Sequence, residues 1–576
     1  MRLSGAEILA RILIEQGVDT IFGYPGAAVL PIYDALFDHR DKITHYITAH
    51  EQGATHAADG YARSTGKVGV VLATSGPGST NIVTGVATAF MDSSPLVVIT
   101  GNVATPYIGK DSFQEVYTTG ITLPITKHNF SVQDVRLLAP TLREAFAIAI
   151  SGRRGPVLVD ITKDAQAAWC EFEPEQQDEP VSSGRPLRYA GTQVCFSQTE
   201  VEAALERLSA SSKPLVIFGG GVISANASAE LYEFIRATRI PATHSIMGIG
   251  ALDVDDPLNL GLVGMHGRRS GNITLGEADL ILALGFRFSD RVALNTENWA
   301  QKAYIIQVDI DQSEVDKNVA VDQAIIGDVR DVLRAMLEAI QSRGSLGGLG
   351  ADYSSWHEQI SRWRASDLMP PDDDAKLMPH QVIQAICEAA GDTVIFTTDV
   401  GQHQMWAAQY CGRMQPRSFI TSGGLGAMGF GYGAAIGAQI GTAGLTERRR
   451  PVVHVTGDGS FHMNLNEACT AVSYRLPIIT VIFNNQVLGM VRQWQKNFYD
   501  ERYSATTLDR ATDYVKLAEA FGLVGKRAAT IAEFKAAFSE ALVVDGPVWI
   551  ECVIDRDEQV FPMIPSGGTF EDTIVV

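Results

Sequence analysis

"PVVHVTGDGSFHMNLNE", residues 451–467, is the stretch of sequence that decides the fold. It opens with a run of β-branched and apolar residues, turns at Asp458 between two glycines, and continues in a helical pattern. A run that is apolar on both faces is typical of a strand in a parallel sheet that helices cover on both sides. "PIITVIFNNQVLGMV", residues 477–491, repeats this plan, and its predicted strand ends at Asn484 and Asn485. Together the two stretches predict a doubly wound α/β sheet.

The same plan of strand, turn and helix recurs along the chain. Comparable apolar runs stand in "VGVVLATSGPG", "PLVVITGN", "GPVLVDI", "PLVIFGGG", "ADLILALG", "YIIQVDI", "TVIFTTD" and "PVWIECVI". Two polar stretches, residues 171–189 and 343–375, interrupt the rhythm and are expected to connect domains. We therefore predict three doubly wound parallel-sheet domains of the α/β class, spanning residues 1–170, 190–342 and 376–560, followed by a C-terminal tail at 561–576.

The bulk composition excludes several classes of partner. The 576 residues carry a formal net charge of −20, and so acidic a chain is not expected to bind nucleic acid or an anionic membrane. No apolar run is long enough to span a bilayer, and the N-terminal stretch has no secretory leader pattern. The six cysteines are scattered, without the spacing of a metal site. We expect a cytoplasmic protein with free thiols.

Asp458 and the asparagine pair place oxygen ligands at the ends of two strands. Mg²⁺ prefers about six oxygens in octahedral geometry and usually takes some of them from phosphate. The carboxylate of Asp458, the amide oxygen of Asn485 and the backbone carbonyl of Val487 would supply part of this shell, and a diphosphate and water the rest. Either motif alone would be an ordinary turn. The residues that would let the backbone approach the anion are Gly457, Gly459 and Ser460, where a helix is expected to begin.

"AHEQGATHAADGYAR", residues 49–63, predicts a helix with a carboxylate on its apolar stripe. The stripe runs through alanines and Tyr61, and Glu51 lies one turn before it on the same face. Because burial of an unpaired charge is costly, Glu51 needs a partner on the packed side. The alternative role of Glu51 is that of an acid stabilising a helix N-terminus.

The Gly-Asp-Gly turn followed by an asparagine pair one strand later resembles the thiamine-diphosphate motif. Over nearly its whole length the chain resembles the large catalytic subunits of acetohydroxyacid synthase, also called acetolactate synthase. The segments that carry this resemblance are "GYPGAAVLPIYDAL", "HEQGATHAADGYAR", "SGPGSTN", "SFQEV", "ITKHNF", "SGRRGPVLVDITKD", "GMHG", "GFRFSDR", "DVGQHQMWAAQ", "TSGGLGAMGFG", "GDGSFHMNLNE", "NNQVLGMVRQW" and "PMIPSGG".

The resemblance implies a pyrimidine-binding domain, a central FAD-binding domain and a diphosphate-binding domain, in that order. It implies thiamine diphosphate, Mg²⁺ and FAD as cofactors. In the implied reaction, pyruvate loses carbon dioxide and its two-carbon unit joins a second pyruvate or 2-ketobutyrate. The products, 2-acetolactate and 2-aceto-2-hydroxybutyrate, lead to valine, leucine and isoleucine. The resemblance also implies a homodimer or tetramer, in which Glu51 of one chain meets the cofactor held by the other, and often a small regulatory subunit.

The resemblance also assigns residues to the thiamine site. Glu51 would be the catalytic carboxylate at the pyrimidine ring, and Lys163 would neutralise the substrate carboxylate, unless it is a surface lysine. Trp494 matches the position linked with preference for the larger acceptor, and core packing is the alternative for Trp494 and for Met428. The implied cofactor positions are Tyr24, Pro25, Gly26, Val400, Gly401, Gln402, His403, Gly426, Met428, Gly457, Gly459 and Ser460, and the substrate side adds Phe113, Gln114, Lys163, Met490 and Trp494.

The flavin implied for the central domain is a structural cofactor rather than a redox one. Its implied contacts are Arg153, Gly219, Gly220, Gly221, Ser245, Ile246, Met265, His266, Gly285, Arg287, Arg291, Asp309, Gly327 and Asp328. The chain departs from the usual RFDDR run, because Ser289 replaces the first aspartate. A serine can still hydrogen-bond a ribityl hydroxyl or a phosphate, so the change weakens that single contact and not the site.

Other members of the thiamine class remain as alternatives. One is a flavin-linked oxidoreductase of the pyruvate oxidase type, against which the "GMVRQW" and "SFQE" motifs argue. Another is a different carboligase: glyoxylate-type enzymes lack the catalytic glutamate, whereas a sulfoacetaldehyde acetyltransferase-like enzyme stays open. A non-catalytic relative that only binds the cofactors is the last, and the presence of every candidate chemical residue argues against it.

Overall fold

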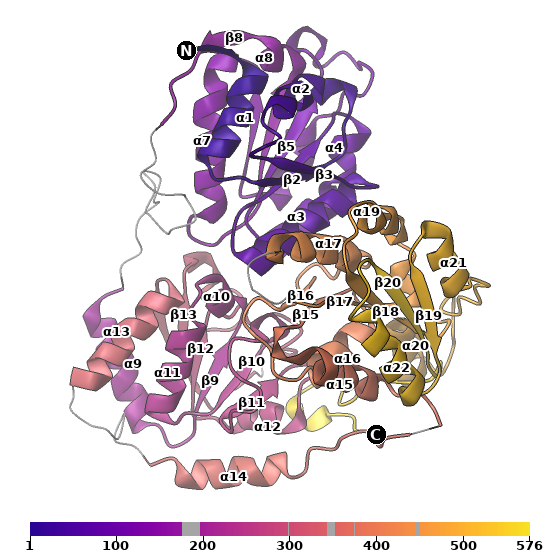
Figure 1. Cartoon of the computed structure of the whole chain (residues 1–576). Coiled ribbons are helices and arrows are strands. Elements are labelled where there is room, and N and C mark those ends of the chain that lie inside the picture. The colour runs from indigo at the N-terminus through magenta and orange to yellow at the C-terminus, as the bar shows by residue number, and fades with distance from the viewer. Residues whose placement is uncertain (176–195, 298, 343–351, 374, 444–449, 576) are drawn as a thin grey trace.

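The computed structural model describes the whole chain apart from residues 176–195, 298, 343–351, 374, 444–449 and 576. Three domains each contain one six-stranded sheet with helices on both faces, and the N-terminal domain lies above the other two in Figure 1. Every neighbouring pair of strands within these sheets is parallel. The predicted α/β class with three doubly wound sheets is confirmed.

The N-terminal sheet has the order β3-β2-β4-β5-β7-β6, and its central strands are buried on both faces. Its strands are β2 (Thr20–Gly23), β3 (Thr44–Ile47), β4 (Gly69–Ala73), β5 (Leu96–Asn102), β6 (His128–Val132) and β7 (Val157–Thr162). Its helices are α1 (Gly5–Glu15), α2 (Leu30–Asp38), α3 (Glu51–Thr65), α4 (Pro77–Asn81), α5 (Val83–Met91), α6 (Thr118–Thr122), α7 (Val135–Ile150) and α8 (Lys163–Ala167). A separate antiparallel pair joins β1 (Arg2–Ser4) to β8 (Trp169–Glu171).

The central sheet has a different strand order, β11-β10-β9-β12-β13-β14. Counted within the sheet this is 3-2-1-4-5-6, the order of dinucleotide-binding folds, whose ligand lies where the strand order reverses. The strands are β9 (Pro214–Phe218), β10 (Ala242–His244), β11 (Asn259–Leu262), β12 (Leu280–Leu284), β13 (Tyr304–Asp309) and β14 (Gln323–Ile326). The helices are α9 (Gln198–Ala210), α10 (Gly220–Ser224), α11 (Ser228–Thr238), α12 (Arg269–Glu277) and α13 (Val329–Ser342).

The C-terminal sheet, β16-β15-β17-β18-β20-β19, repeats the order of the N-terminal one, since both count as 2-1-3-4-6-5. Its strands are β15 (Ile395–Thr398), β16 (Phe419–Thr421), β17 (Val452–Gly457), β18 (Ile478–Asn484), β19 (Val524–Ala528) and β20 (Val548–Val553). Its helices are α15 (Pro379–Ala390), α16 (Gln402–Tyr410), α17 (Phe430–Thr442), α18 (Asp458–Phe461), α19 (Ala468–Ser473), α20 (Gly489–Phe498), α21 (Tyr514–Phe521) and α22 (Ile531–Ala541).

Helices α3 and α17 join the first and third domains at a close crossing (Figure 1). A methyl carbon on Gly437 of α17 would lie 1.7 Å from the carbonyl oxygen of Ala57, and one on Gly60 of α3 would lie 2.1 Å from that of Ala434. The backbones approach so closely that no side chain fits between them. Helix α3 is therefore buried on nearly every side, whereas the sequence predicted a single buried stripe.

Both ends of α3 are also bonded to the C-terminal domain. Just before its first turn, the backbone N–H groups of Ala49 and His50 each donate to the carboxylate of Glu467, at 3.1 Å. At its last turn, Arg63 Nη1 donates to the carbonyl of Thr421, at 2.7 Å, and Arg417 donates to the carbonyl of Arg63, at 3.1 Å. These bonds fix the direction of the helix that begins with Glu51.

The predicted connections contain ordered structure where they are described. Helix α14 (Ser354–Arg364) occupies part of the second connection, and buried Trp356 on it donates to the carbonyl of Pro214, at 3.1 Å. In the C-terminal tail, the N–H of Ile564 donates to the carbonyl of Met265, at 2.8 Å. Residues 176–189 and 343–351 of the predicted connections lie outside the described residues. Within the described parts of the chain, no helix is both long and apolar enough to cross a bilayer.

Gly437→Ala is expected to disturb the crossing of α3 and α17. The added methyl group would overlap the carbonyl of Ala57, and we expect the free energy of unfolding to fall by about 1–3 kcal/mol, as for an overpacked core. The measurement is urea denaturation followed by circular dichroism. Gly412→Ala is the control, because its methyl carbon would lie at an ordinary 3.4 Å from Cβ of Cys387. Equal stability of the two variants would contradict a close crossing.

Candidate active site

The residues predicted to bind the metal meet at one edge of the C-terminal sheet. Strands β17 and β18 are parallel neighbours, with Gly457 opposite Phe483, so the residues that follow them lie side by side. These are Asp458, the first residue of α18, and Asn485, both of which are buried. Burial raises the pKa of Asp458 to about 7, because the charged carboxylate loses its water, and a bound cation would compensate that loss.

The two asparagines at the end of β18 differ in their hydrogen bonds. Asn484 is a structural residue, since its amide donates to Glu551 at 2.7 Å and its oxygen accepts from the N–H of Gln486 at 3.2 Å. Within the described part of the chain, Asn485 Oδ1 accepts only a long bond from the N–H of Val487, at 3.3 Å. Among the described residues, no group of three or more His, Cys, Asp or Glu side chains could hold a metal ion. The predicted ligand set is of a different kind, since it combines the carboxylate of Asp458 with the amide oxygen of Asn485 and the carbonyl of Val487, and oxygens of these types suit Mg²⁺.

The predicted cofactor residues Val400, Gly401, Gln402 and His403 follow β15, beside β17, where the strand order of the C-terminal sheet reverses. The ring of His403 is buried, and its Nε2 has no hydrogen-bond partner among the described residues. Burial lowers the pKa of His403 to about 4, so the ring is neutral at neutral pH. A methyl carbon on Gly457 would lie 2.9 Å from His403 Nδ1. A buried, unpartnered ring nitrogen beside a bare backbone fits an anion at this place.

Three further predicted residues have other partners in the chain. Ser460 Oγ donates to the carbonyl of Val400, at 2.9 Å, so it fixes the loop after β15. The amide of Gln402 donates to Gln493 and to the carbonyl of Glu558, at 3.0 and 2.8 Å. Gln402 thus joins α16 to α20 and to the C-terminal segment. The methyl group of Met428 lies 3.9 Å from where a Cβ of Gly459 would stand, which brings Met428 to the metal edge.

On the N-terminal domain, the predicted pyrimidine residues gather where that sheet reverses its order, between β2 and β4. Tyr24, Pro25 and Gly26 follow β2, and a Cβ on Gly26 would lie 2.5 Å from Thr74, which follows β4. The hydroxyl of Thr74 is buried without a hydrogen-bond partner among the described residues. The side chain of Glu51 is buried and accepts one hydrogen bond, from Asn81 Nδ2 at 3.0 Å.

The predicted substrate residues lie on two different domains. Gln114 adopts φ +59° and packs against the turn at Gly76, while its neighbour Phe113 is 88% exposed. Lys163 is exposed at the start of α8. Met490 and Trp494 belong to α20 of the C-terminal domain, and the ring of Trp494 lies 5.1 Å from that of Phe498.

A cavity of about 880 Å³ lies where the three domains meet, and its size suits a large organic cofactor. It opens where the order of the central sheet reverses, between β9 and β12. There a methyl carbon on Gly221 would lie 2.5 Å from the Cα of Gly285, so the two turns leave a bare backbone surface. Its lining includes the predicted residues Arg153, Gly219, Gly220, Gly221, Ser245, Ile246, Met265, His266, Gly285, Arg287, Arg291, Asp309 and Asp328.

The lining of this cavity differs in some residues from the predicted flavin contacts. Gly327 is not among the lining residues, because it packs against the ring of Phe196 instead, where a Cβ would lie 2.7 Å from Cδ1. Val400 and Gly426, predicted for thiamine, line the cavity as well, so it extends toward the C-terminal cofactor site. Sequence reasoning missed Arg154, Lys317, Met91, Asp92, Ser93, Gly423 and Gly424. For Asp92, the only sequence signal was a charge between two apolar runs.

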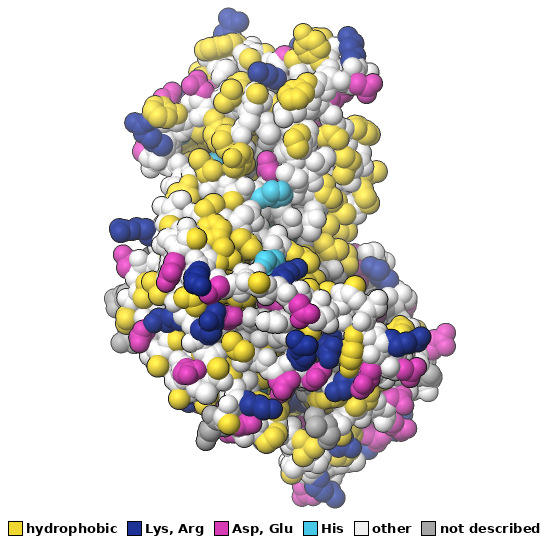
Figure 2. Space-filling view, turned by 90° about the vertical axis from the view of Figure 1, so that its right-hand side faces the viewer, with side chains coloured by type: hydrophobic (Ala, Val, Ile, Leu, Met, Phe, Trp, Pro, Cys, Tyr) yellow, Lys and Arg dark blue, Asp and Glu magenta, His cyan; other side chains and the backbone are white. Residues whose placement is uncertain are grey.

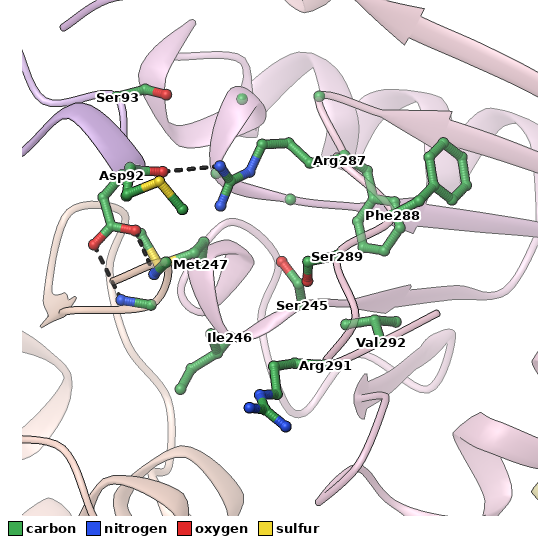
Figure 3. A pocket seen from close by; sticks show the side chains of 18 of the residues that line it. Asp92, Ser93, Ser245, Ile246, Met247, Arg287, Phe288, Ser289, Arg291 and Val292 are labelled. Atoms are coloured by element: carbon green, nitrogen blue, oxygen red, sulfur yellow. Dashed lines mark hydrogen bonds between the residues drawn. The ribbon is translucent and has the colours of Figure 1, made fainter. Parts of the chain in front are cut away.

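The cations of the cavity are held in defined directions. Arg287 Nη1 donates to the carbonyl of Met91, at 2.9 Å, and Figure 3 shows it reaching toward the Asp92 turn, while Arg291 projects elsewhere. Arg153 donates to Ser93 Oγ, at 2.8 Å, and to Glu314, at 2.6 Å. The cavity thus combines glycine turns, a strand reversal and oriented arginines, which fit the phosphates of a dinucleotide.

Comparison with known proteins agrees with this arrangement. Residues 3–121 match the thiamine pyrophosphate enzyme N-terminal TPP binding domain, residues 201–336 the central domain and residues 399–552 the C-terminal TPP binding domain. The acetolactate synthase isozyme 2 large subunit of Escherichia coli is 43% identical over 569 residues, covering 98% of both chains. The probable acetolactate synthase large subunit of Methanocaldococcus jannaschii is 40% identical over 587 residues, covering 99% of this chain and 95% of its own.

This chain belongs to the family of acetolactate synthase large subunits, within the thiamine pyrophosphate enzymes. The three matched domains coincide with the three sheets. In this family context the C-terminal edge at Asp458 belongs to a TPP binding domain, and so does the N-terminal domain that carries Glu51.

Asp458→Ala is expected to abolish Mg²⁺-dependent retention of thiamine diphosphate, because it removes the only carboxylate of the ligand set. Retention is measured by gel filtration of the protein with cofactor and Mg²⁺, followed by assay of bound thiamine. Asp545→Ala, at an exposed position, should retain the cofactor as the unchanged protein does. Retention by Asp458→Ala at the level of this control would remove Asp458 from the metal site.

Proposed function

We propose that this chain catalyses the acetolactate synthase reaction with thiamine diphosphate, Mg²⁺ and FAD. Pyruvate is decarboxylated, and its two-carbon unit is transferred to a second pyruvate or to 2-ketobutyrate. The observation that carries this proposal is the edge at which Asp458, Asn485 and His403 meet at a strand reversal, where His403 Nε2 has no hydrogen-bond partner among the described residues. The reaction begins branched-chain amino acid synthesis.

When bound, thiamine diphosphate supplies a nucleophilic carbon that takes up pyruvate and accommodates the electron pair left by carbon dioxide. In this proposal Asp458, Asn485 and Val487 would hold the Mg²⁺, and His403 would bind the diphosphate. Met428 would contact the cofactor. Glu51 moves a proton at the pyrimidine ring. Asn81 orients the Glu51 carboxylate through the bond to Oε2.

The catalytic unit in this proposal is at least a homodimer. The start of α3 is bonded to Glu467 of its own chain, and among the described residues Asn81 is the only hydrogen-bond partner of the Glu51 side chain. Figure 2 shows hydrophobic side chains gathered over the upper part of the molecule, the N-terminal domain of Figure 1. Large exposed apolar residues of the N-terminal domain include Leu30, Phe113, Tyr117 and Leu123, and those of the C-terminal domain include Leu425, Met463 and Val491. An exposed apolar surface of this kind suits a second copy of the chain.

The flavin acts as a structural cofactor in this proposal. The glycine turns and arginines of the cavity bind the dinucleotide, and Ser289 takes the place of a carboxylate in its lining. Because the relatives are named large subunits, we also propose that a small regulatory subunit binds this chain.

The function is tested with purified protein, thiamine diphosphate, Mg²⁺, FAD and pyruvate, with and without 2-ketobutyrate, under anaerobic conditions. We expect acetolactate from pyruvate alone, acetohydroxybutyrate when 2-ketobutyrate is added, and a flavin absorbance that stays oxidised during turnover. Full bleaching of the flavin at the turnover rate would instead support an oxidoreductase of the pyruvate oxidase type. This is the second candidate, because Val400 and Gly426, which are predicted for thiamine, also line the flavin cavity.

Glu51→Gln is expected to slow turnover by about 10²- to 10⁴-fold, the range for lost acid–base assistance, while cofactor binding stays nearly intact. The steady-state rate with pyruvate and the bound thiamine content are measured together. Glu202→Gln, an exposed change on α9, serves as the control. A near-normal rate in Glu51→Gln would remove Glu51 from the mechanism.

Trp494→Leu is expected to lower the preference for 2-ketobutyrate over pyruvate by about tenfold, because a large apolar contact with the longer acceptor is lost. The ratio of the two products is measured in competition at fixed substrate concentrations. Trp169→Leu makes the same chemical change on β8, at a mostly exposed position, and should leave the ratio unchanged. An unchanged ratio in Trp494→Leu would mean that Trp494 only packs.

A further inference from the structure

The turn at Met91, Asp92 and Ser93, which follows α5, is contacted by all three domains. Arg287 of the central domain donates to the carbonyl of Met91, and Arg153 of the N-terminal domain donates to Ser93 Oγ. The C-terminal domain contributes the loop after β16. Figure 3 shows Asp92 at this junction, with dashed hydrogen bonds to the neighbouring loop. The turn is therefore placed to orient cofactor-binding segments of different domains.

Asp92 accepts hydrogen bonds with both of its carboxylate oxygens. The N–H of Gly424 donates to Asp92 Oδ1 at 2.7 Å, and the N–H of Gly423 donates to Oδ2 at 3.0 Å. Each carboxylate oxygen thus accepts one backbone N–H from adjacent residues of a single loop. Arg63 Nη2 completes the set by donating to Oδ2, at 2.9 Å. Bonds to an ionised acceptor are about twice as strong as neutral ones.

The loop that Asp92 binds is also closely packed against its surroundings. A methyl carbon on Gly424 would lie 2.9 Å from Asp92 Oδ1, and one on Gly423 would lie 2.4 Å from Met247 Sδ of the central domain. The loop continues through Gly426, which lines the flavin cavity, to Met428 beside the metal edge. A shift of the loop would therefore move residues that face both cofactors.

We propose that Asp92 is a positioning residue that fixes the loop from Gly423 to Met428, and that this single carboxylate sets the geometry of both cofactor sites. The inference rests on the proposed use of thiamine diphosphate and FAD. Asp92 itself lines the flavin cavity. In this proposal it acts on both cofactor sites through the two backbone N–H groups of the loop and through Arg63, which ties the same carboxylate to α3.

The chain offers a matched control for this inference. The side chain of Asp59 is as deeply buried as that of Asp92 and binds the same arginine, with Arg63 Nε donating to Oδ1 at 2.7 Å and Nη2 to Oδ2 at 3.1 Å. None of its hydrogen bonds among the described residues goes to the loop. Asp59→Asn and Asp92→Asn therefore remove the same charge from the same cluster. In each variant an NH₂ group, which is a donor, replaces an oxygen that accepted hydrogen bonds from neighbouring N–H groups. Only Asp92→Asn disturbs Gly423 and Gly424.

The experiment measures cofactor binding directly. Apoprotein is titrated with FAD, followed by flavin fluorescence, and with thiamine diphosphate in the presence of Mg²⁺, followed by calorimetry. We expect Asp92→Asn to weaken both affinities by about tenfold or more, the scale for loss of a charge-assisted hydrogen bond. We expect Asp59→Asn to change each affinity by less than about twofold, as for a site with no shared partner in the loop. Thermal unfolding of the two apoproteins reports whether both fold equally.

Equal losses in the two variants would overturn the inference, because Asp92 would then act only through the Arg63 cluster. Unchanged affinities in Asp92→Asn would overturn it as well. Should Asp92→Asn fail to fold, Gly424→Ala disturbs the same contact from the loop side while both aspartates stay, and it should reproduce the tenfold loss; normal binding would contradict the inference. Failure of the unchanged protein to bind either cofactor would count against the proposed function itself.

Discussion

The backbone-to-backbone crossing of α3 and α17 is the constraint on which the rest of the structure depends. Because Gly60 and Gly437 bring the two helices together without a side chain between them, the first and third sheets are held at one fixed distance. The bonds of Glu467 to Ala49 and His50 then fix the start of α3. Glu51 is the first residue of that helix. The direction of the Glu51 side chain is therefore set by this contact and not by bonds of the side chain itself.

The second feature that the proposed sites share is the burial of polar or ionisable side chains that bound cofactors could satisfy. His403 Nε2 and Thr74 Oγ1 have no hydrogen-bond partner among the described residues, and burial raises the pKa of Asp458 to about 7. Such groups cost stability in the free chain. Bound cofactors that supply a cation, an anion and a ring would satisfy them, so cofactor binding is expected to stabilise the fold.

Much of the fold could be predicted from the sequence, because strands that are buried on both faces leave unmistakable apolar runs. Most of the residues that sequence motifs suggested for the flavin likewise line one cavity. Contacts between segments that are far apart in the chain leave no local pattern in the sequence, so they could not be predicted. Asp92 meets Gly423 and Gly424 across more than 300 positions, and the burial of α3 on every side follows from a second helix that periodicity alone does not reveal. Gly327 was predicted from a motif, but the ring of Phe196 occupies its surroundings.

The central claim is that each catalytic site is shared, with Glu51 from one chain and Asp458 from another. Co-expression of Glu51→Gln and Asp458→Ala chains tests it, because each mixed dimer would then hold one complete site. With random pairing and a dimeric unit we expect about a quarter of the unchanged protein's activity in the mixture, although either variant alone is inactive. A mixture as inactive as its two parents would contradict a shared site and would place both residues at work within a single chain.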